Sequence, residues 1–418
     1  MRRVFVYLAA SVVGFASWAD AGDVEIRTGP WRAWLDSPGG DLPFGMELEH
    51  AGDTWRAWLI NGSERIQVPN VILGDGAITF DMIHYDSKIT AKPNAEGTRL
   101  DGEWTKTAGK DKVSRLGFHA VAGAAARFTP LAMSTADELR KIEGRWSVRF
   151  SSSDEPAVGV FKIESDGTVE GTFMTDTGDY RYLAGIYERR RLRLSCFDGA
   201  HAFLFDARLQ KDGTLKGDFW SRDVWHETWT AERDSKARNP DGFNQVRARG
   251  AIRFDELVFP DLEGKPRSLG DAEFDGKARI IEIFGTWCPN CHDASQLLNE
   301  LHELYGRQGL SIVGLAFELT GDFKRDARQV RRYVQVHNVK YPILIAGVAD
   351  KEKASAKFPF LESVRAFPTT VFTDSDGNIL AVHSGFSGPA TGEANRMMRL
   401  KFRSLIKQLI RKANEEGT

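Results

Sequence analysis

Hydrophobic and polar residues alternate through most of the chain between about residues 24 and 235. In "DYRYL" (179–183) and "AFLFDARL" (202–209), apolar side chains recur at every second position, which is the period of a β-strand with one buried face. Asp-Gly pairs, for example at 166–167 and 212–213, fall between such runs and are typical of turns between antiparallel strands. The pattern predicts an all-β region.

This region also repeats. Two pairs of landmarks recur at an offset of 115 residues: Trp31 and Trp146 in "GPWRAWLDS" and "GRWSVRFSS", and Gly102 and Gly217 in "RLDGEWTKT" and "TLKGDFWSR". Each copy of roughly 100 residues has room for about eight short strands, which is enough to close a small barrel. We therefore predict lipocalin-like β-barrel repeats over residues 24–130 and 138–235. A single larger sheet shared by both copies is the alternative.

The hydrophobic period changes after residue 235. Residues 236–250 are polar, carry proline and glycine and lack alternation, which indicates a linker. Buried-strand runs and helical stretches then follow in the order β-α-β-α-β-β-α, at about 278–285, 288–306, 310–317, 326–337, 341–346, 369–373 with 378–385, and 391–412. This order predicts one open α/β domain over 251–412, preceded by a hairpin within 254–269.

Length and charge support a soluble protein of several domains. The chain has 418 residues, more than one hydrophobic core usually organises, and 42% of them are hydrophobic and 27% charged. The formal net charge of -2 argues against a broad nucleic-acid-binding surface, so no nucleic-acid partner is expected. The sequence predicts no particular oligomeric state.

The N-terminus has the features of an export signal. Arg2 and Arg3 precede an apolar run over residues 4–18, and Ala19-Asp20-Ala21 then resembles a cleavage site. We predict a signal peptide over 1–21, with an uncleaved anchor as the alternative. Either form places the protein in the periplasm or outside the cell, in an oxidising compartment.

Two of the three cysteines lie in "FGTWCPNCHDAS", between a buried strand and a helix. Cys288 falls at the N-cap and Pro289 at the first helical position, where proline is favoured. A Cys288 thiolate would face unpaired backbone N–H groups and the positive end of the helix dipole, which lower a thiol pKa. Cys291 lies on the same helical face and can close a disulfide with Cys288. The spacing predicts a redox couple.

Two other interpretations of this motif are weaker. A zinc site needs four ligands, but the chain has no second C-x-x-C, and His292 points roughly 100° away from Cys291 around a helix. A structural staple that closes four residues would stabilise the fold by only about 2 kcal/mol. We therefore expect no metal site and no cofactor besides the Cys288–Cys291 redox pair. Cys196, in the strand-like "RLRLSCFDG", is expected to be a buried core residue.

The motif carries a family resemblance. "IEIFGTWCPNCHDA", followed later by "AFPTT", resembles the thioredoxin-like TlpA/ResA group of extracytoplasmic thiol-disulfide oxidoreductases over about residues 252–412. The resemblance implies a thioredoxin fold, with Cys288 as the attacking thiol and Cys291 as the resolving thiol. It also implies a cis-proline at Pro368, opposite the pair. Further residues are expected at the substrate-binding rim: Trp287, Pro289, Asn290, Phe367 and Thr369.

Glu282 is a departure from the group. It lies six residues before Cys288, where thioredoxins proper carry a buried acid, but where many members of the group have a neutral residue. A buried carboxyl group there would have a raised pKa and could relay the proton of Cys291. The alternative is a glutamate on a solvent-facing edge. Some members have a glutamate where Ala294 stands, so Glu282 or Glu318 would have to fill that role.

The main prediction is an extracytoplasmic thiol-disulfide oxidoreductase that reduces protein disulfides, with the β region as a docking module. The resemblance further implies a membrane electron donor. The alternative is a ligand-binding β-barrel protein with a redox-sensing thioredoxin-like domain. A peroxidase is disfavoured because its motif places Thr or Ser three residues before the cysteine, where this chain has Gly285.

Overall fold

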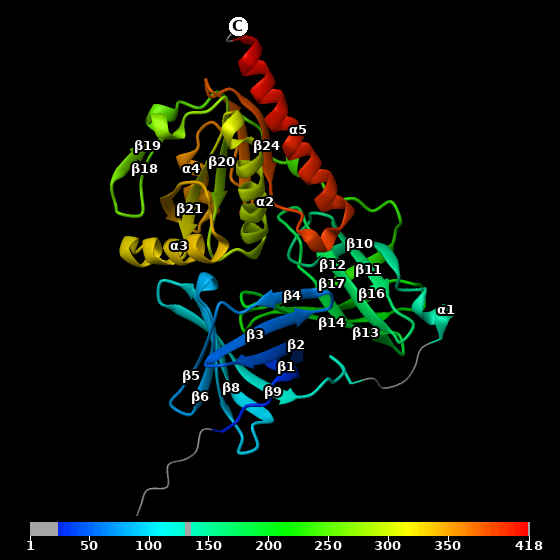
Figure 1. The fold of residues 1–418 in the computed structure, drawn as a ribbon. Coiled ribbons are helices and arrows are strands. Elements are labelled where there is room, and N and C mark those ends of the chain that lie inside the picture. Colours follow the sequence, from blue (N-terminus) through cyan, green and yellow to red (C-terminus); the bar gives the residue numbers. More distant parts are fainter. Residues whose placement is uncertain (1–23, 130–134, 417–418) are drawn as a thin grey trace, which may run out of the picture.

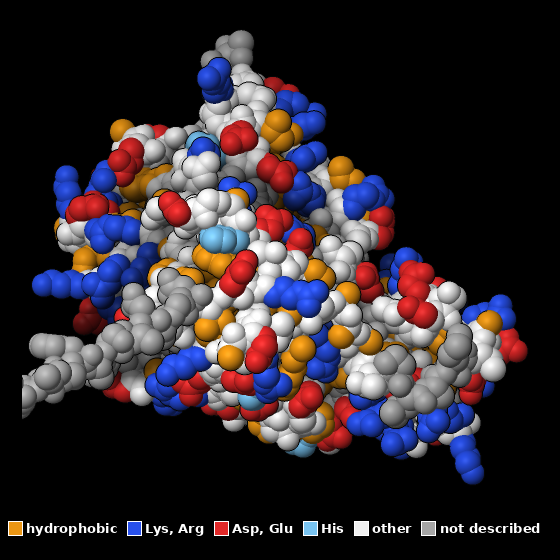
Figure 2. Space-filling view, turned by 60° about the horizontal axis from the view of Figure 1, so that its bottom comes forward, with side chains coloured by type: hydrophobic (Ala, Val, Ile, Leu, Met, Phe, Trp, Pro, Cys, Tyr) orange, Lys and Arg blue, Asp and Glu red, His pale blue; other side chains and the backbone are white. Residues whose placement is uncertain are grey.

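The computed structural model describes residues 24–129 and 135–416, in three units (Figure 1). Two β units lie next to each other, and the C-terminal α/β domain packs across both. The predicted signal peptide over 1–21 lies outside the described residues. No helix within the described ranges is long and apolar enough to cross a lipid bilayer. On the face shown in Figure 2, Lys and Arg side chains are intermixed with Asp and Glu side chains.

The first β unit is a curled antiparallel sheet of nine strands in the order β4-β3-β2-β1-β9-β8-β7-β6-β5. Its strands are β1 (Gly29–Ser37), β2 (Gly40–Ala51), β3 (Thr54–Asn61), β4 (Glu64–Gln67), β5 (Asn70–Gly74), β6 (Ala77–Met82), β7 (Ser87–Pro93), β8 (Arg99–Gly109) and β9 (Lys112–Ala122). The unit is curled, as the barrel-like prediction for this copy requires, but the sheet is not closed: the short extra strand β4 pairs with the outer edge of β3. That edge therefore does not pair with β5.

The second β unit is a closed barrel of eight antiparallel strands, in which β10 pairs with both β11 and β17. Helix α1 (Ala136–Leu139) precedes it. The strands are β10 (Gly144–Phe150), β11 (Ala157–Ile163), β12 (Thr168–Met174), β13 (Leu183–Glu188), β14 (Arg191–Phe197), β15 (Ala202–Leu209), β16 (Leu215–Ser221) and β17 (Trp225–Arg233). The barrel confirms the prediction for the second copy and shows that the alternative of one shared sheet is wrong.

Aromatic side chains fill the barrel. Phe173 lies 4.7 Å from Phe205 and 5.1 Å from Trp229 between ring centroids, and Phe205 stacks on Phe219 at 4.3 Å. All four are buried, as is Cys196, which confirms that this cysteine is a core residue. Burial of so much aromatic surface gives the small barrel a solid core.

The tryptophans that reveal the repeat have the same role in both units. Trp31, in β1, donates its indole N–H to the Arg27 carbonyl at 3.0 Å, and Trp146, in β10, donates to the Ile142 carbonyl at 2.8 Å. In both cases the acceptor is four residues earlier, so each indole ties the incoming chain to the first strand of its unit.

The C-terminal domain is built on a five-stranded sheet in the order β22-β21-β20-β23-β24. Strands β20, β21 and β22 are parallel, whereas β23 and β24 are antiparallel to their neighbours. The elements are β18 (Val258–Pro260), β19 (Pro266–Ser268), β20 (Ala278–Phe284), α2 (Pro289–Tyr305), β21 (Leu310–Glu318), α3 (Phe323–His337), β22 (Ile343–Val348), α4 (Lys351–Lys357), β23 (Thr369–Asp374), β24 (Ile379–Ser384) and α5 (Glu393–Glu416). The predicted order is present, and α4 is an additional short helix.

The segment between the barrel and this domain is not a free linker. Residues 236–250 contain only a short 3₁₀ turn, η2 (Gly242–Asn244). Within it, the Phe243 ring lies 4.6 Å from His383 and 5.9 Å from Phe402 between centroids. One aromatic side chain in an otherwise polar segment thus anchors the connection against β24 and α5.

Candidate active site

Cys288 stands at the N-cap of α2, directly after the central strand β20. Its Sγ accepts a hydrogen bond from the Cys291 backbone N–H at 3.3 Å, and its thiol lies 3.3 Å from the Phe367 carbonyl oxygen, to which it donates. Only 7% of Cys288 is exposed. A thiolate formed here would take up the same N–H group and face the positive end of the helix dipole, as the sequence predicted.

Cys291 is fully buried one turn further along α2. Burial, the Cys288 side chain and the Glu282 carboxyl group all raise the pKa of the Cys291 thiol well above its usual value. Both cysteines are free thiols in this structure. The pair is therefore asymmetric: Cys288 can accept hydrogen bonds as a thiolate, whereas Cys291 retains its proton.

The segment that the motif "AFPTT" predicts lies opposite the cysteines. The Phe367–Pro368 peptide bond is cis. Pro368 precedes β23, which pairs with β20. Thr369 is fully buried and donates its hydroxyl to the Ala366 carbonyl at 2.8 Å. Because Phe367 also contacts Cys288 through its carbonyl group, this turn and the start of α2 form one surface.

Trp287, which was predicted for the substrate rim, also has a structural role. Its indole N–H donates to the Phe317 carbonyl at 2.8 Å, which fixes the ring against the end of β21. The ring also meets Phe367 edge-on at 5.6 Å between centroids and is only half-buried. It supports the turn before Cys288 and contributes to the exposed rim.

Glu282 lies on the central strand β20 with no exposed surface, so the alternative of a solvent-facing glutamate is wrong. Its Oε2 accepts a hydrogen bond from the Tyr341 hydroxyl at 3.0 Å, while its Oε1 has no partner among the described residues. Burial raises the pKa of this carboxyl group to about 8, although the Tyr341 hydrogen bond opposes the shift. At neutral pH Glu282 is mostly protonated.

Glu318, the other candidate acid, holds the turn between β20 and α2. Its two oxygens accept hydrogen bonds from the Thr286 backbone N–H at 2.9 Å and from the Thr286 hydroxyl at 2.7 Å. Burial raises the pKa of Glu318 to about 7. The side chain therefore positions the residues that lead into Cys288.

The barrel reaches this site through the loop between β12 and β13, residues 175–182. The Asn290 amide approaches the Asp179 carbonyl oxygen at 3.5 Å, and the Asp179 carboxylate accepts a hydrogen bond from the Gly388 N–H. Asn290 is only 9% exposed as a result, and Pro289 is buried. Asn290, which was predicted for the substrate rim, thus lies under the barrel loop, an arrangement that no local sequence pattern contains.

Arg181, in the same loop, joins all three units. Its side chain is 8% exposed and forms ion pairs with Asp293 of α2, with Glu64 of the first β unit at 2.9 Å, and with Asp198 of the barrel at 3.6 Å. Although burial alone would lower it, the Asp293 and Glu64 carboxylates raise the pKa of Arg181 well above its usual value. The first turns of α2 are therefore tied electrostatically to both β units.

Sequence reasoning missed one cluster beside the cysteines. Three histidines, His84, His292 and His337, each have one ring nitrogen within 4.8 Å of a ring nitrogen of the other two. They come from three segments far apart in the chain, and only the position of His292 next to Cys291 hinted at a role. The expectation of no metal site considered spacing along the chain and so could not detect this grouping.

The C-terminal domain is similar to known thiol-disulfide oxidoreductases. Residues 252–382 match the AhpC/TSA family. The ResA protein of Bacillus cereus is 31% identical over 124 residues, which are 30% of this chain and 63% of ResA. The ResA protein of Halalkalibacterium halodurans is 27% identical over 138 residues, 33% of this chain and 70% of ResA. The chain thus spans less than two thirds of the first of these relatives, and its β units lie outside the matched family region.

Solved structures align with the same part of the chain. A thioredoxin-family thiol:disulfide interchange protein from Chlorobium tepidum is 19% identical and covers 42% of this chain and 99% of its own, with a TM-score of 0.29. A secreted disulfide oxidoreductase from Mycobacterium tuberculosis is 18% identical and covers 35% of this chain and 96% of its own, with a TM-score of 0.27. The C-terminal domain has the thioredoxin fold, and the ResA matches confirm the resemblance that its C-x-x-C and cis-proline motifs predicted.

Proposed function

We propose that this protein is an extracytoplasmic thiol-disulfide oxidoreductase that reduces disulfides in protein substrates. The observation that carries the proposal is the position of Cys288 Sγ, which accepts a backbone N–H at the start of α2 and lies beside the cis-proline turn. This arrangement gives Cys288 Sγ a backbone hydrogen-bond donor and places it next to a buried partner thiol, as attack and resolution by a pair of thiols require. The signal-like segment at 1–21 supports the location outside the cytoplasm.

The reaction has two exchange steps. The Cys288 thiolate attacks one sulfur of the substrate disulfide, so that a mixed disulfide forms, the substrate S–S bond breaks and the leaving thiolate takes up a proton. Cys291 then loses its proton and attacks Cys288 Sγ. The Cys288–Cys291 bond forms, the mixed disulfide breaks, and the second substrate thiolate leaves. Two electrons pass to the substrate, and a membrane electron donor would restore the dithiol.

Glu282 is the residue we propose for proton relay in the second step. Because its pKa of about 8 lies close to physiological pH, a fraction of Glu282 is ionised there, and this ionised form can accept the Cys291 proton and later return it. The coupling between the two groups supports this role, because the Glu282 charge raises the pKa of Cys291. No other carboxyl group of the described residues is among the main influences on the Cys291 pKa.

The barrel is proposed to restrict which substrates reach Cys288. Its 175–182 loop covers Asn290 and contacts the chain after β24 at Gly388. The alternative of a ligand-binding barrel finds no support, because aromatic side chains occupy the interior. A docking role thus agrees with the structure better than storage of a small ligand.

The test is reduction of insulin disulfides by the prereduced full-length protein, combined with trapping of substrates. Cys288→Ser is expected to abolish reduction. Cys291→Ser is expected to accumulate mixed disulfides that dithiothreitol releases. Cys196→Ala is the matched control, because that thiol is buried in the barrel and should not affect either readout. If the wild-type protein reduces no insulin and Cys291→Ser traps no partner, the proposed function is wrong.

A further inference from the structure

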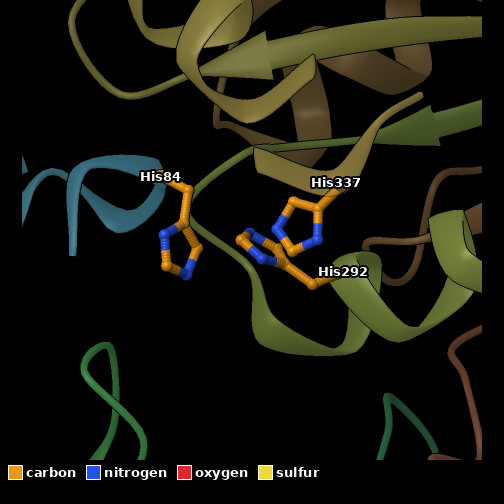
Figure 3. A group of neighbouring side chains, drawn as sticks. All are labelled: His84, His292 and His337. Atoms are coloured by element: carbon orange, nitrogen blue, oxygen red, sulfur yellow. The ribbon is translucent and has the colours of Figure 1, made fainter. Parts of the chain in front are cut away.

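The three histidines converge from two different domains (Figure 3). His84 comes from the 3₁₀ turn η1 (Ile83–Tyr85) of the first β unit, His292 from the first turns of α2, and His337 from the end of α3. The ring centroids of His292 and His337 are 4.4 Å apart, and each lies 5.3 Å from that of His84. His84 is 4% exposed and His292 is 3% exposed. Three imidazoles thus share one small, mostly buried volume.

Their hydrogen bonding is incomplete in a way that suits a ligand. His84 Nδ1, His292 Nδ1 and His337 Nε2 are all buried and have no hydrogen-bond partner among the described residues. The other ring nitrogen of His292 lies 2.7 Å from the Thr286 carbonyl oxygen, so Nε2 carries the proton and Nδ1 presents its lone pair. A backbone carbonyl on the second nitrogen is the usual way in which proteins orient a metal-binding histidine.

Aromatic neighbours hold the rings in place. Tyr85 stacks on His292 at 4.2 Å between centroids, and Tyr333 packs edge-on to the same ring at 4.7 Å. Burial lowers the pKa of His84 to about 3 and that of His337 to about 4, and it lowers the pKa of His292 well below its usual value.

We propose that His84, His292 and His337 form a binding site for a divalent transition-metal ion of the Zn²⁺ type, which joins the first β unit to the thioredoxin-fold domain. Three imidazole ligands with a fourth position left for water are typical of zinc sites. The cluster lines a cavity of about 690 Å³ between the two units, with Glu64, Asp293 and Gln296 also on its walls. In a tetrahedral site with Zn–N distances of about 2.0–2.1 Å, the ligand nitrogens lie about 3.4 Å apart. Metal binding would therefore bring the three ligand nitrogens, which lie within 4.8 Å of one another in this structure, closer together.

This site does not include the cysteines, and metal binding to it would affect how the domains are held together. Two ligands belong to the thioredoxin-fold domain and one to the first β unit, so the ion would hold the first β unit against α2 and α3. Metal binding should then stabilise the docked form of the full-length protein by mass action. The inference does not depend on the proposed reductase activity, because no cysteine is a ligand.

The test uses a full-length variant without the three cysteines, so that thiol groups cannot bind the metal. Calorimetric titration with Zn²⁺ is expected to show one ion per chain, with a dissociation constant on the order of 1 µM or tighter. His84→Gln and His337→Gln should each weaken binding by more than about 100-fold. His302→Gln, which alters a histidine of α2 outside the cluster, is the matched control and should leave binding unchanged.

Circular dichroism and thermal unfolding distinguish a variant that has lost the metal site from one that does not fold. Circular dichroism of each variant shows whether it is folded, and if His84→Gln does not fold, His337→Gln carries the test because His337 is only half-buried at the end of α3. Zn²⁺ should raise the thermal unfolding midpoint of the parent and of His302→Gln, but not of the other two. Failure of the parent to bind Zn²⁺, or equal binding by all variants, would overturn the proposed site.

Discussion

Replacement of Glu282 by glutamine preserves the side-chain shape and the acceptor for the Tyr341 hydroxyl, but removes the titratable group. In the unfolded chain the carboxyl group titrates near its ordinary value of 4.5, whereas burial raises its pKa to about 8 in the folded protein. Between these values the folded state binds one proton that the unfolded state has released. The wild-type protein therefore loses stability as the pH rises from about 4.5 to about 8, and Glu282→Gln should not show this loss.

The magnitude follows from the pKa difference. One pKa unit corresponds to about 1.4 kcal/mol, so the free energy of unfolding should fall by about 1.4 kcal/mol per pH unit across this window. At pH 7 the accumulated loss is about 3 kcal/mol, since 7 lies about 2.5 units above the unfolded value. Below pH 4.5 the two proteins should be almost equally stable, because Glu282 is then protonated in both states.

The assay is urea unfolding of the reduced wild-type protein and of Glu282→Gln at several pH values from 4.5 to 8.5. The difference between the two unfolding free energies isolates Glu282, because all other titrating groups are common to both proteins. The same variant should slow resolution of the mixed disulfide about 100-fold at pH 7 while Cys288 still attacks at the normal rate. A stability difference that does not change with pH would show that Glu282 is already ionised in the folded protein and would refute the reasoning.

Arg181→Met should destabilise the protein by about 3–5 kcal/mol in urea unfolding, because it leaves the buried Glu64 and Asp293 carboxylates without their counter-ion; an unchanged midpoint would mean that solvent reaches them. Gly217→Ala should destabilise the barrel by about 1–3 kcal/mol, because the added methyl group would lie 2.2 Å from the Asp206 carbonyl oxygen. Gly74→Ala is the control and should have little effect, because no atom lies within 4 Å of a methyl group added there. Trp146→Phe should lower stability by about 1 kcal/mol through loss of its indole hydrogen bond, and equal stability in the same assay would show that this bond contributes nothing.

The redox pair could be predicted from the sequence because its determinants are contiguous. One buried strand, one helix start and two cysteines three residues apart place Cys288 and Cys291 without any long-range contact. The alternation of the β region likewise predicted antiparallel strands, and the repeated tryptophans marked equivalent first strands. These features depend on local periods and on helix-end geometry, which a single chain segment determines.

Closure of the first sheet and the histidine cluster could not be predicted in this way. The four residues of β4 decide whether β3 has a free edge, and a segment this short gives almost no periodic signal. His84, His292 and His337 meet only because η1 of the first β unit packs against α2 and α3. Such contacts depend on how folded units pack against each other. The shapes and charges of their surfaces determine this packing, and spacing along the chain does not.

The β units dock partly on the first turns of α2, the helix that carries both cysteines, and partly on α3, where Gln329 donates to the Ile83 and His84 carbonyls. Asn290 faces the barrel loop, His292 faces His84 and Tyr85 of the first β unit, and Asp293 pairs with Arg181. Residues on both sides of Cys291 are therefore fixed by partners outside the thioredoxin-fold domain. A shift of the β units would change the exposure of Asn290 and separate the histidines in the same movement. Access to the dithiol and integrity of the histidine cluster are thus coupled through a single helical turn.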